Sequence, residues 1–241
     1  MKLKLGKKGP SNDKRNLKLV KYMEPSLVPP DQVNWQNNCT YQMYLNDQLS
    51  DCTCAAVGNQ IITWENNVNN NNILSNNDVL GLYELVGGYN PNDPTTDQGC
   101  VETDVLNYWT NSGVNGHKIG AYVQIDNTNL NQIKNAIAYM EGTYIGIQVP
   151  EGIPEDPGSV WDVIPNAEIE GGHAIILVGY DDNYLYTISW GAVYKMTYAF
   201  FTTYCDEAYA LVSNDELNGN GVNAASLNIN QLNNDLKIVK A

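Results

Sequence analysis

The chain contains 241 residues, of which 43% are hydrophobic and 17% are charged, and its formal net charge is −14. This composition is typical of a globular protein with one large domain or two closely packed lobes. A chain of this length can bury a stable core without disulfides or a structural metal. No apolar run approaches the roughly 20 residues that span a bilayer, and the N-terminus lacks the apolar centre of a signal peptide, so we expect cytoplasmic synthesis and no membrane span.

Basic side chains are concentrated at the N-terminus. Eight of the thirteen lysines and arginines precede Tyr22, with Asp13 as the one acidic residue among them. The rest of the chain is strongly acidic, which disfavours nucleic acid as a partner of the body and draws the basic segment to acidic surfaces. We therefore expect residues 1–32 to form a basic, extended arm that contacts its own body or a neighbour in a homo-oligomer or a virion. The alternative is a solvated tail, the usual state of a basic terminus.

The folded body is expected to cover residues 33–241, and its first part, residues 33–115, has mainly helical patterns. A helix is predicted to begin at or beside Cys52, where Asp51 is suited to cap the free backbone N–H groups. Serine or asparagine before an apolar run and glycine after it mark helix ends. These signals predict two further helices, over residues 78–86 and 101–110.

From residue 119 the pattern changes to short runs rich in β-branched and aromatic residues, which are typical of strands. We predict strands over residues 119–125, 143–149, 174–180, 184–190, 195–198 and 207–212. A helix over residues 129–140 interrupts them. Helices followed by strands indicate an α+β fold, in which a helical lobe packs on an antiparallel, barrel-like β lobe over residues 116–215, with a functional cleft between the lobes. Residues 216–241 are assigned to a C-terminal tail or helix.

Cys52 and His173 are the clearest candidates for chemistry. A thiol becomes an effective nucleophile as the thiolate, and the N-terminus of a helix favours that form. A histidine that pairs with such a thiolate and protonates the departing amine can lie far away in the sequence. Of the two histidines, His173 begins a predicted strand and His117 lies in a polar turn. Judged by residue type alone, a cysteine at a helix start is more often a packed or inert thiol, and a histidine at a strand start is more often structural.

The segments around these two residues carry a family resemblance. Residues 47–56, DQLSDCTCAA, resemble the nucleophile segment of bacterial and phage members of the papain family. Residues 172–181, GHAIILVGYD, resemble the histidine strand of that family, and residues 189–191, SWG, resemble the end of its Asn-Ser-Trp-Gly strand. The opening residues 9–16, GPSNDKRN, are similar to the extended lead-in of such proteins. The order and spacing of the segments also match.

The resemblance implies a papain-like cysteine peptidase or amide hydrolase that acts on peptide or protein substrates without a cofactor. Cys52 would attack the carbonyl carbon, and His173 would move the proton. Ile188 stands where the family places the asparagine that orients the histidine, so the triad is incomplete as written. Asn46 stands six residues before the cysteine, at the position of the family's oxyanion glutamine, and Gln48 is the second candidate for that role.

Other residues near these segments are expected to shape the site. We expect Gly172, Ser189 and Trp190 in the wall of the cleft. Cys54 is expected to pack in the core, because a zinc site needs four ligands and a Cys-x-Cys spacing does not suit it, so we expect no metal site. Five cysteines are an odd number, which argues against a disulfide framework and leaves at least one free thiol.

Two further interpretations stay open. The first is a papain fold that is kept as a catalytically inactive structural or interaction module, such as a phage virion or assembly component docked through its arm. The second is acyl transfer of the transglutaminase type, which uses the same Cys52 and His173 but which nothing in the sequence selects. Ile188 favours the inactive module, and the intact segments around Cys52 and His173 favour the peptidase.

Overall fold

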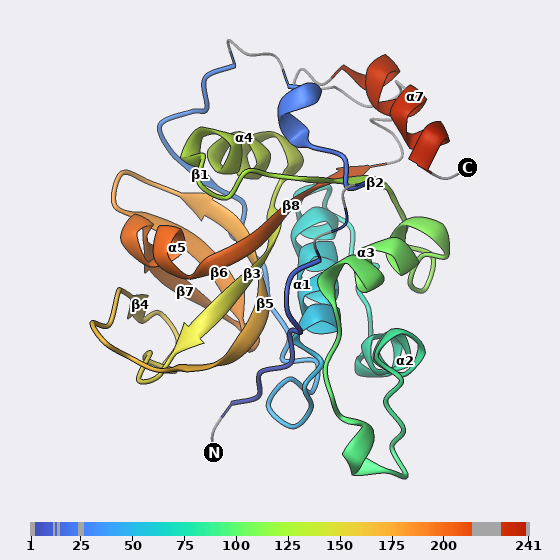
Figure 1. Ribbon diagram of the computed structural model, residues 1–241, viewed down its shortest axis with the longest axis vertical. Coiled ribbons are helices and arrows are strands. Elements are labelled where there is room, and N and C mark those ends of the chain that lie inside the picture. Colours follow the sequence, from blue (N-terminus) through green and yellow to red (C-terminus); the bar gives the residue numbers. More distant parts are fainter. Residues whose placement is uncertain (1–2, 12, 14, 24–26, 214–227, 240–241) are drawn as a thin grey trace.

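Figure 1 shows the computed structural model, which describes residues 3–11, 13, 15–23, 27–213 and 228–239. The helices of the first half and the strands of the second half form a mixed α+β structure, as the sequence predicts. Three helices carry the first lobe: α1 (Cys52–Asn67), α2 (Asn76–Gly87) and α3 (Glu102–Asn111). Among the described residues, no helix is both long and apolar enough to cross a bilayer.

One eight-stranded sheet, formed mostly by the second half of the chain, has β5 as its central element. The strand order is β2-β8-β3-β5-β6-β7-β4, and β1 also pairs with β5. All pairs are antiparallel except β4 with β7. The strands are β1 (Val33–Asn34), β2 (Ile119–Gln124), β3 (Thr143–Pro150), β4 (Val160–Trp161), β5 (Ile169–Tyr180), β6 (Tyr184–Ser189), β7 (Ala192–Thr197) and β8 (Cys205–Ser213).

Further helices complete the chain. They are α4 (Leu130–Met140), α5 (Tyr198–Tyr204), α7 (Ile229–Val239) and the short 3-10 helices η1 (Leu19–Lys21) and η2 (Pro94–Thr96). The predicted strand over residues 195–198 is wrong at its end, because Thr197 accepts a hydrogen bond from the backbone N–H of Phe200 and so caps α5. The aromatic residue at the end of the predicted strand, Tyr198, is the first residue of α5. Phe200 and Phe201 of α5 are completely buried, which stabilises this helix.

Asp51 differs from its predicted role at the start of α1. Its backbone is not in the extended conformation that capping residues adopt, and its side chain makes no capping hydrogen bond. The carboxyl group is instead completely buried. The predicted cap is therefore wrong, although the helix begins where the sequence indicates.

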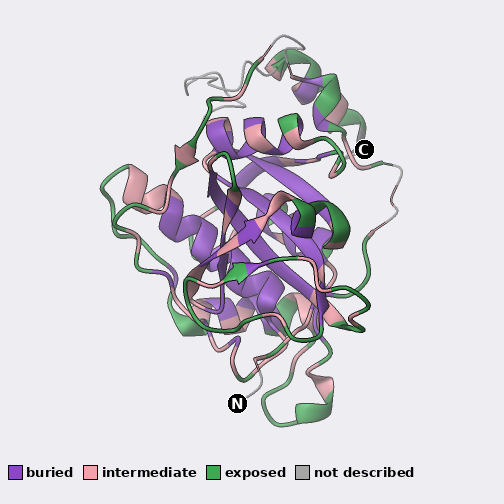
Figure 2. Ribbon diagram, turned by 90° about the vertical axis from the view of Figure 1, so that its left-hand side faces the viewer, coloured by how far each residue is buried: buried purple, intermediate pink, exposed green. Residues whose placement is uncertain are grey.

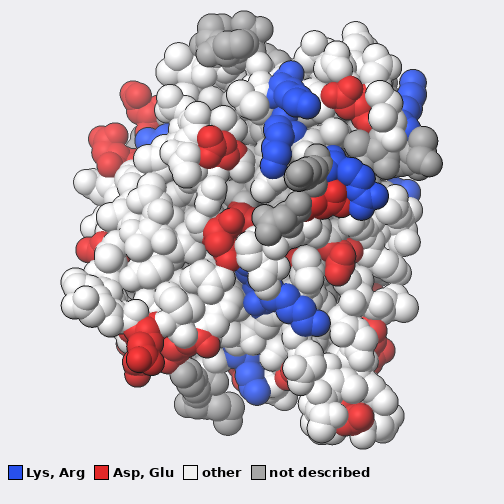
Figure 3. Space-filling view, in the orientation of Figure 1, with Lys and Arg blue, Asp and Glu red and all other residues white. Residues whose placement is uncertain are grey.

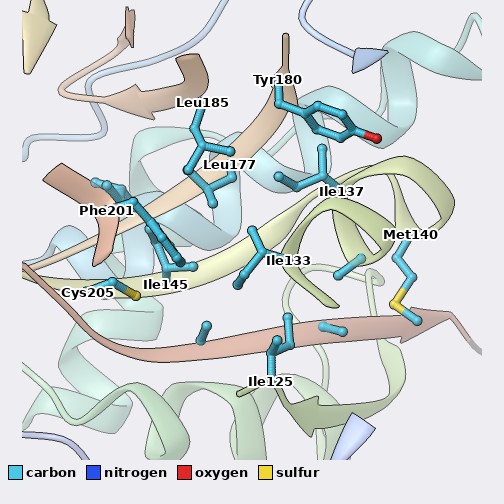
Figure 4. Packing of buried hydrophobic residues seen from close by; sticks show 14 of the residues in the cluster. Ile125, Ile133, Ile137, Met140, Ile145, Leu177, Tyr180, Leu185, Phe201 and Cys205 are labelled. Atoms are coloured by element: carbon cyan, nitrogen blue, oxygen red, sulfur yellow. The ribbon is translucent and has the colours of Figure 1, made fainter. Parts of the chain in front are cut away.

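The sheet has a hydrophobic core on each face. Alternate residues of β5 serve the two cores, because successive side chains of a strand point to opposite faces. Ile175 and Leu177 belong to the core that includes residues of α4 and α5, whereas Ala174, Ile176 and Val178 pack with α1, α2 and α3. Figure 4 shows Leu177 in the first of these cores. Burial on both faces explains why this strand is a continuous apolar run. Figure 2 shows the buried centre in the sheet and α1.

The described part of the N-terminal arm lies along the body. Residues 3–8, here called the arm strand, pass between β5 and the segment that precedes α3 (Figure 1), and Lys7 forms isolated bridges with both. Further along, Lys18 forms a bridge with Gln124 of β2. Basic side chains follow the course of the arm across one face of the molecule, and acidic side chains border them (Figure 3).

Candidate active site

Cys52 is the first residue of α1 and lies where the helix meets the sheet. Its sulfur accepts the backbone N–H of Ala174 at 3.4 Å. Because Ala174 follows His173 directly on β5, this contact places the two candidate residues on facing elements. The thiol is 1% exposed. The fold thus places the Cys52 sulfur beside the residue that follows His173, although the two segments are far apart in the sequence.

His173 contacts the last residue of β6 and the residue that follows it. Its Nε2 lies 2.7 Å from Oγ of Ser189, and its ring stacks on the indole of Trp190 with the centroids 4.5 Å apart. Nδ1 is buried and has no hydrogen-bond partner among the described residues. If Nε2 carries the proton that Ser189 accepts, Nδ1 presents a lone pair, as a general base for a thiol requires.

Ser189, and not Ile188, is therefore the residue whose side chain contacts the His173 ring. Ile188 pairs with Ile176 of β5, and its side chain is buried in the core on the helical side. Successive residues of a strand point to opposite faces, so Ile188 and Ser189 cannot both face the imidazole. The sequence placed Ser189 only in the cleft wall. The sequence signal for this contact was the Ser189 hydroxyl, which stands one residue after the position expected for the asparagine.

Burial dominates the pKa values of both Cys52 and His173. Burial raises the pKa of the Cys52 thiol to about 12, although the N–H of Ala174 opposes the shift. Burial also lowers the pKa of His173 to about 3. Both groups are consequently uncharged at neutral pH in this state. A buried thiol with a raised pKa is mainly protonated, and the protonated thiol is a weaker nucleophile than the thiolate.

The arm strand lies next to the residues that flank this pair. The N–H of Lys7 donates to the carbonyl oxygen of Gly172 at 3.0 Å, and the N–H of Cys100 donates to the carbonyl oxygen of Gly6 at 3.0 Å. Trp190 donates from Nε1 to the carbonyl oxygen of Lys4 at 3.1 Å. The arm strand thus has hydrogen-bond partners on β5, on the segment before α3 and on the aromatic residue that stacks on His173.

Close approach of the arm strand depends on glycine. A Cβ atom built at Gly6 would overlap the carbonyl group of Ser50, and one built at Gly99 would overlap the carbonyl group of Gly6. A Cβ atom built at Gly172 would meet the carbonyl oxygen of Lys7. The cleft therefore fits the backbone of the arm strand with no room for larger residues at these positions.

The two candidate oxyanion donors both lie in the loop before α1. Asn46 is buried and donates from Nδ2 to the carbonyl oxygen of Leu49 at 3.2 Å. Gln48 is exposed and donates to the carboxylate of Asp47 at 3.5 Å. Burial makes Asn46 the better placed of the two, and an oxyanion role for either residue stays a prediction.

The other singled-out residues lie outside this arrangement. Cys54 is buried, and its pKa is raised well above that of an ordinary thiol by burial and by Cys100. His117 lies elsewhere, with Nδ1 3.8 Å from the carboxylate of Glu65. All five cysteines are free thiols. Within the part of the chain that the structure describes, no group of three or more His, Cys, Asp or Glu side chains could hold a metal ion.

Asp51 is a notable neighbour of the pair that sequence reasoning assigned only to capping. Burial raises the pKa of its carboxyl group to about 8, and the side chain of Asn46 opposes this shift. An uncharged acid therefore precedes the thiol near neutral pH. No sequence signal distinguishes this aspartate from an ordinary capping residue.

Comparisons with known proteins identify the fold. No protein-family model matches the chain, and no curated protein sequence matches it either. Solved structures do. Xylellain, a cysteine protease from Xylella fastidiosa, is 17% identical with a TM-score of 0.68, and the match covers 88% of this chain and 98% of that one.

Two proenzymes give similar matches. Procathepsin L 3 from Tenebrio molitor larval midgut is 10% identical with a TM-score of 0.62, and the match covers 85% of this chain and 75% of that one. ProCathepsin B S9 from Trypanosoma congolense is 12% identical with a TM-score of 0.59, and the match covers 85% of each chain. The chain therefore has a papain-like α+β fold, which confirms the predicted fold class.

Proposed function

We propose that this protein is a papain-like cysteine peptidase or amide hydrolase whose nucleophile is Cys52 and whose base is His173. The observation that carries the proposal is the hydrogen bond from Ala174 to the Cys52 sulfur, which sets the thiol beside the residue that follows His173. The contact between His173 and Ser189 supports it, because it leaves Nδ1 free to act on the thiol.

The reaction follows from these positions. Nδ1 of His173 takes the thiol proton, and the Cys52 sulfur adds to the carbonyl carbon of a peptide bond. The resulting oxyanion is stabilised by donors at the start of α1, with Asn46 as the proposed side-chain donor. The imidazolium then protonates the departing amine. Water, deprotonated by the same Nδ1, hydrolyses the thioester and restores the thiol.

The described state is latent under this proposal. The arm strand covers the thiol, and burial keeps both members of the pair uncharged. A peptide needs the same space, since the arm strand already bonds Gly172 and Cys100 across the cleft. Catalysis therefore requires the arm strand to leave the cleft first.

Release of the arm strand provides the test. Gly6→Val should expel it, because a Cβ atom there overlaps the Ser50 carbonyl group, whereas Gly9→Val is a matched control with nothing within 4 Å of the added atom. We expect the full-length Gly6→Val protein to cleave a quenched fluorescent peptide library, the Gly9→Val protein to resemble wild type, and Gly6→Val with Cys52→Ala to be inert.

The inactive-module interpretation makes the opposite prediction. A Gly6→Val protein with a native circular-dichroism spectrum and an accessible thiol, but without cleavage of any peptide in the library, would contradict the proposed enzyme. That result would favour a papain fold kept for structural or interaction purposes.

A further inference from the structure

The side chain of Lys7 fills a buried acidic pocket beside the proposed catalytic pair. Its ammonium group is fully buried and lies 2.9 Å from Oδ1 of Asp206 and 2.9 Å from Oε1 of Glu207. Tyr209 donates to the other oxygen of Glu207 at 2.8 Å, and Gln148 donates to Asp206. Both carboxylates are therefore held in place by the body.

Glu102, the first residue of α3, is the third acid of this pocket. It is completely buried, and neither carboxylate oxygen has a hydrogen-bond partner among the described residues. Burial and the negative charge of Glu207 raise its pKa well above the usual value. Burial alone would lower the pKa of Lys7, but Glu102 and Glu207 outweigh burial and raise it. Lys7 is thus the cation that the arm brings to these acids.

The shape of the pocket fits a long, unbranched side chain. A Cβ atom built at Gly146 would overlap Cε of Lys7, and one built at Gly172 would lie 3.4 Å from Cβ of Lys7. Two glycines on neighbouring strands, β3 and β5, therefore leave a slot for the aliphatic stem. The charged head ends at Asp206 and Glu207, at the start of β8.

We infer that the pocket formed by Glu102, Asp206 and Glu207, here called the acidic pocket, binds a lysine or arginine side chain of a peptide, and that Lys7 is its intramolecular occupant. The N–H of Lys7 bonds the carbonyl oxygen of Gly172, one residue before His173. Any residue whose side chain occupies the pocket in this way holds its backbone beside the proposed catalytic pair. The inference rests on the proposed function for cleavage, and it names the substrate class as peptides with a basic residue at this position.

The binding test uses the full chain with its arm released. Lys7→Glu adds a fourth acid and expels the arm strand, and Gly6→Val releases it sterically without changing the pocket. Cys52→Ala is included in both, so that binding is measured without catalysis. The probe is a fluorescein-labelled peptide with the sequence of residues 3–9, and its Kd is measured by fluorescence anisotropy.

Two matched peptides give the decisive comparison. Norleucine in place of the lysine that corresponds to Lys7 keeps the stem and removes the charge, so we expect Kd to rise by about 30-fold or more. Norleucine in place of the lysine that corresponds to Lys8, which is exposed, should change Kd less than about threefold. Equal binding of the two peptides overturns the inference.

A cleavage test separates this inference from the proposed function. In arm-released protein with Cys52 intact, peptides with lysine or arginine at the selected position should have the highest kcat/KM, and Glu207→Lys should shift the preference to acidic residues. Cleavage without a basic preference overturns the inference and leaves the peptidase proposal standing. Charge-dependent binding without any cleavage overturns the peptidase proposal and leaves a site for basic peptides.

Discussion

The Cys52–His173 pair and the acidic pocket lie under the same arm strand, but burial leaves the first uncharged and the second charged. Burial raises the pKa of Cys52 to about 12 and lowers that of His173 to about 3. In the acidic pocket, burial also opposes the charge on Lys7, but the carboxylates around it outweigh that effect. The difference is the presence of fixed opposite charges within ion-pair distance.

The arm strand is therefore bound at the acidic pocket, whereas its expected chemical effect is at the Cys52–His173 pair. The ion pairs of Lys7 with Asp206 and Glu207 favour the docked arm. Under the proposed function, the consequence of docking falls on Cys52, because burial disfavours the thiolate. Variants that act on one region should therefore change the other through the arm strand alone.

The largest expected effect is on the reactivity of Cys52 after arm release. If the thiol pKa falls from about 12 toward the value of about 8.5 for a free cysteine, the thiolate fraction at pH 7 rises by about 10³-fold. We expect Gly6→Val to accelerate alkylation of Cys52 by iodoacetamide on this scale, as followed by mass spectrometry of the cysteine peptides. Cys39 in the same protein serves as an internal control. Unchanged labelling of Cys52 would show that the arm does not control the thiol.

The second expected effect is on the stability of the docked arm. Lys7→Met removes the counter-charge of the acidic pocket, and breaking a buried ion pair costs about 3 kcal/mol or more. We expect the variant to expose its arm to limited proteolysis and to unfold at a lower denaturant concentration. Lys8→Met, at an exposed site, should change the free energy of unfolding by less than about 0.5 kcal/mol. If both variants match wild type, the Lys7 ion pairs do not hold the arm.

The acidic pocket also shows what sequence reasoning could not supply. Helix and strand positions were predictable because their signals are local: β5 is a continuous apolar run, and α2 has Ser75 and Asp78 in a capping box. Cys52 and His173 were found because each lies in a recognisable segment. Lys7 and Asp206 are separated by almost the whole chain, so only the folded register brings them together.

The contact of Ser189 with His173 was missed for a related reason. The family pattern directs attention to the position of Ile188, and strand alternation turns that side chain into the core. Which of two successive residues faces the imidazole depends on the pairing register of β5 with β6, which contains an irregularity between Leu177 and Gly179. The sequence alone indicates that successive side chains alternate between the faces of the sheet, but it does not indicate which of them faces His173.

The third prediction concerns Asp51, a buried acid on the Cys52 side that lacks the counter-charge found in the acidic pocket. Its pKa is about 8 when folded and near 3.8 when exposed. A raised pKa gives stability that is present below about pH 4 and is lost as pH rises toward 8. Between pH 5 and 7 the loss of stability attributable to Asp51 should be on the order of a few kcal/mol, since each pH unit in this window contributes roughly 1 kcal/mol. Asp51→Asn should remove this component from the free energy of unfolding measured against pH. If wild type and variant run parallel over this range, Asp51 is not the buried acid responsible.

The smallest expected effect is on catalysis through Ser189. In arm-released protein, Ser189→Ala removes the acceptor at 2.7 Å from Nε2 of His173 and leaves a buried N–H without a partner, which costs about 1–3 kcal/mol. We expect kcat/KM to fall by about 10-fold and the pH–rate profile to shift, because the tautomer that presents Nδ1 to the thiol is no longer favoured. Ser189→Thr keeps the hydroxyl and should retain most of the activity.

Ile188→Asn should not substitute for the serine, because position 188 faces the core. It should instead lower stability by placing an amide among apolar side chains. Equal kcat/KM and equal pH profiles for Ser189→Ala and the parent would show that Ser189 only fills space, and that stacking on Trp190 suffices to orient the imidazole.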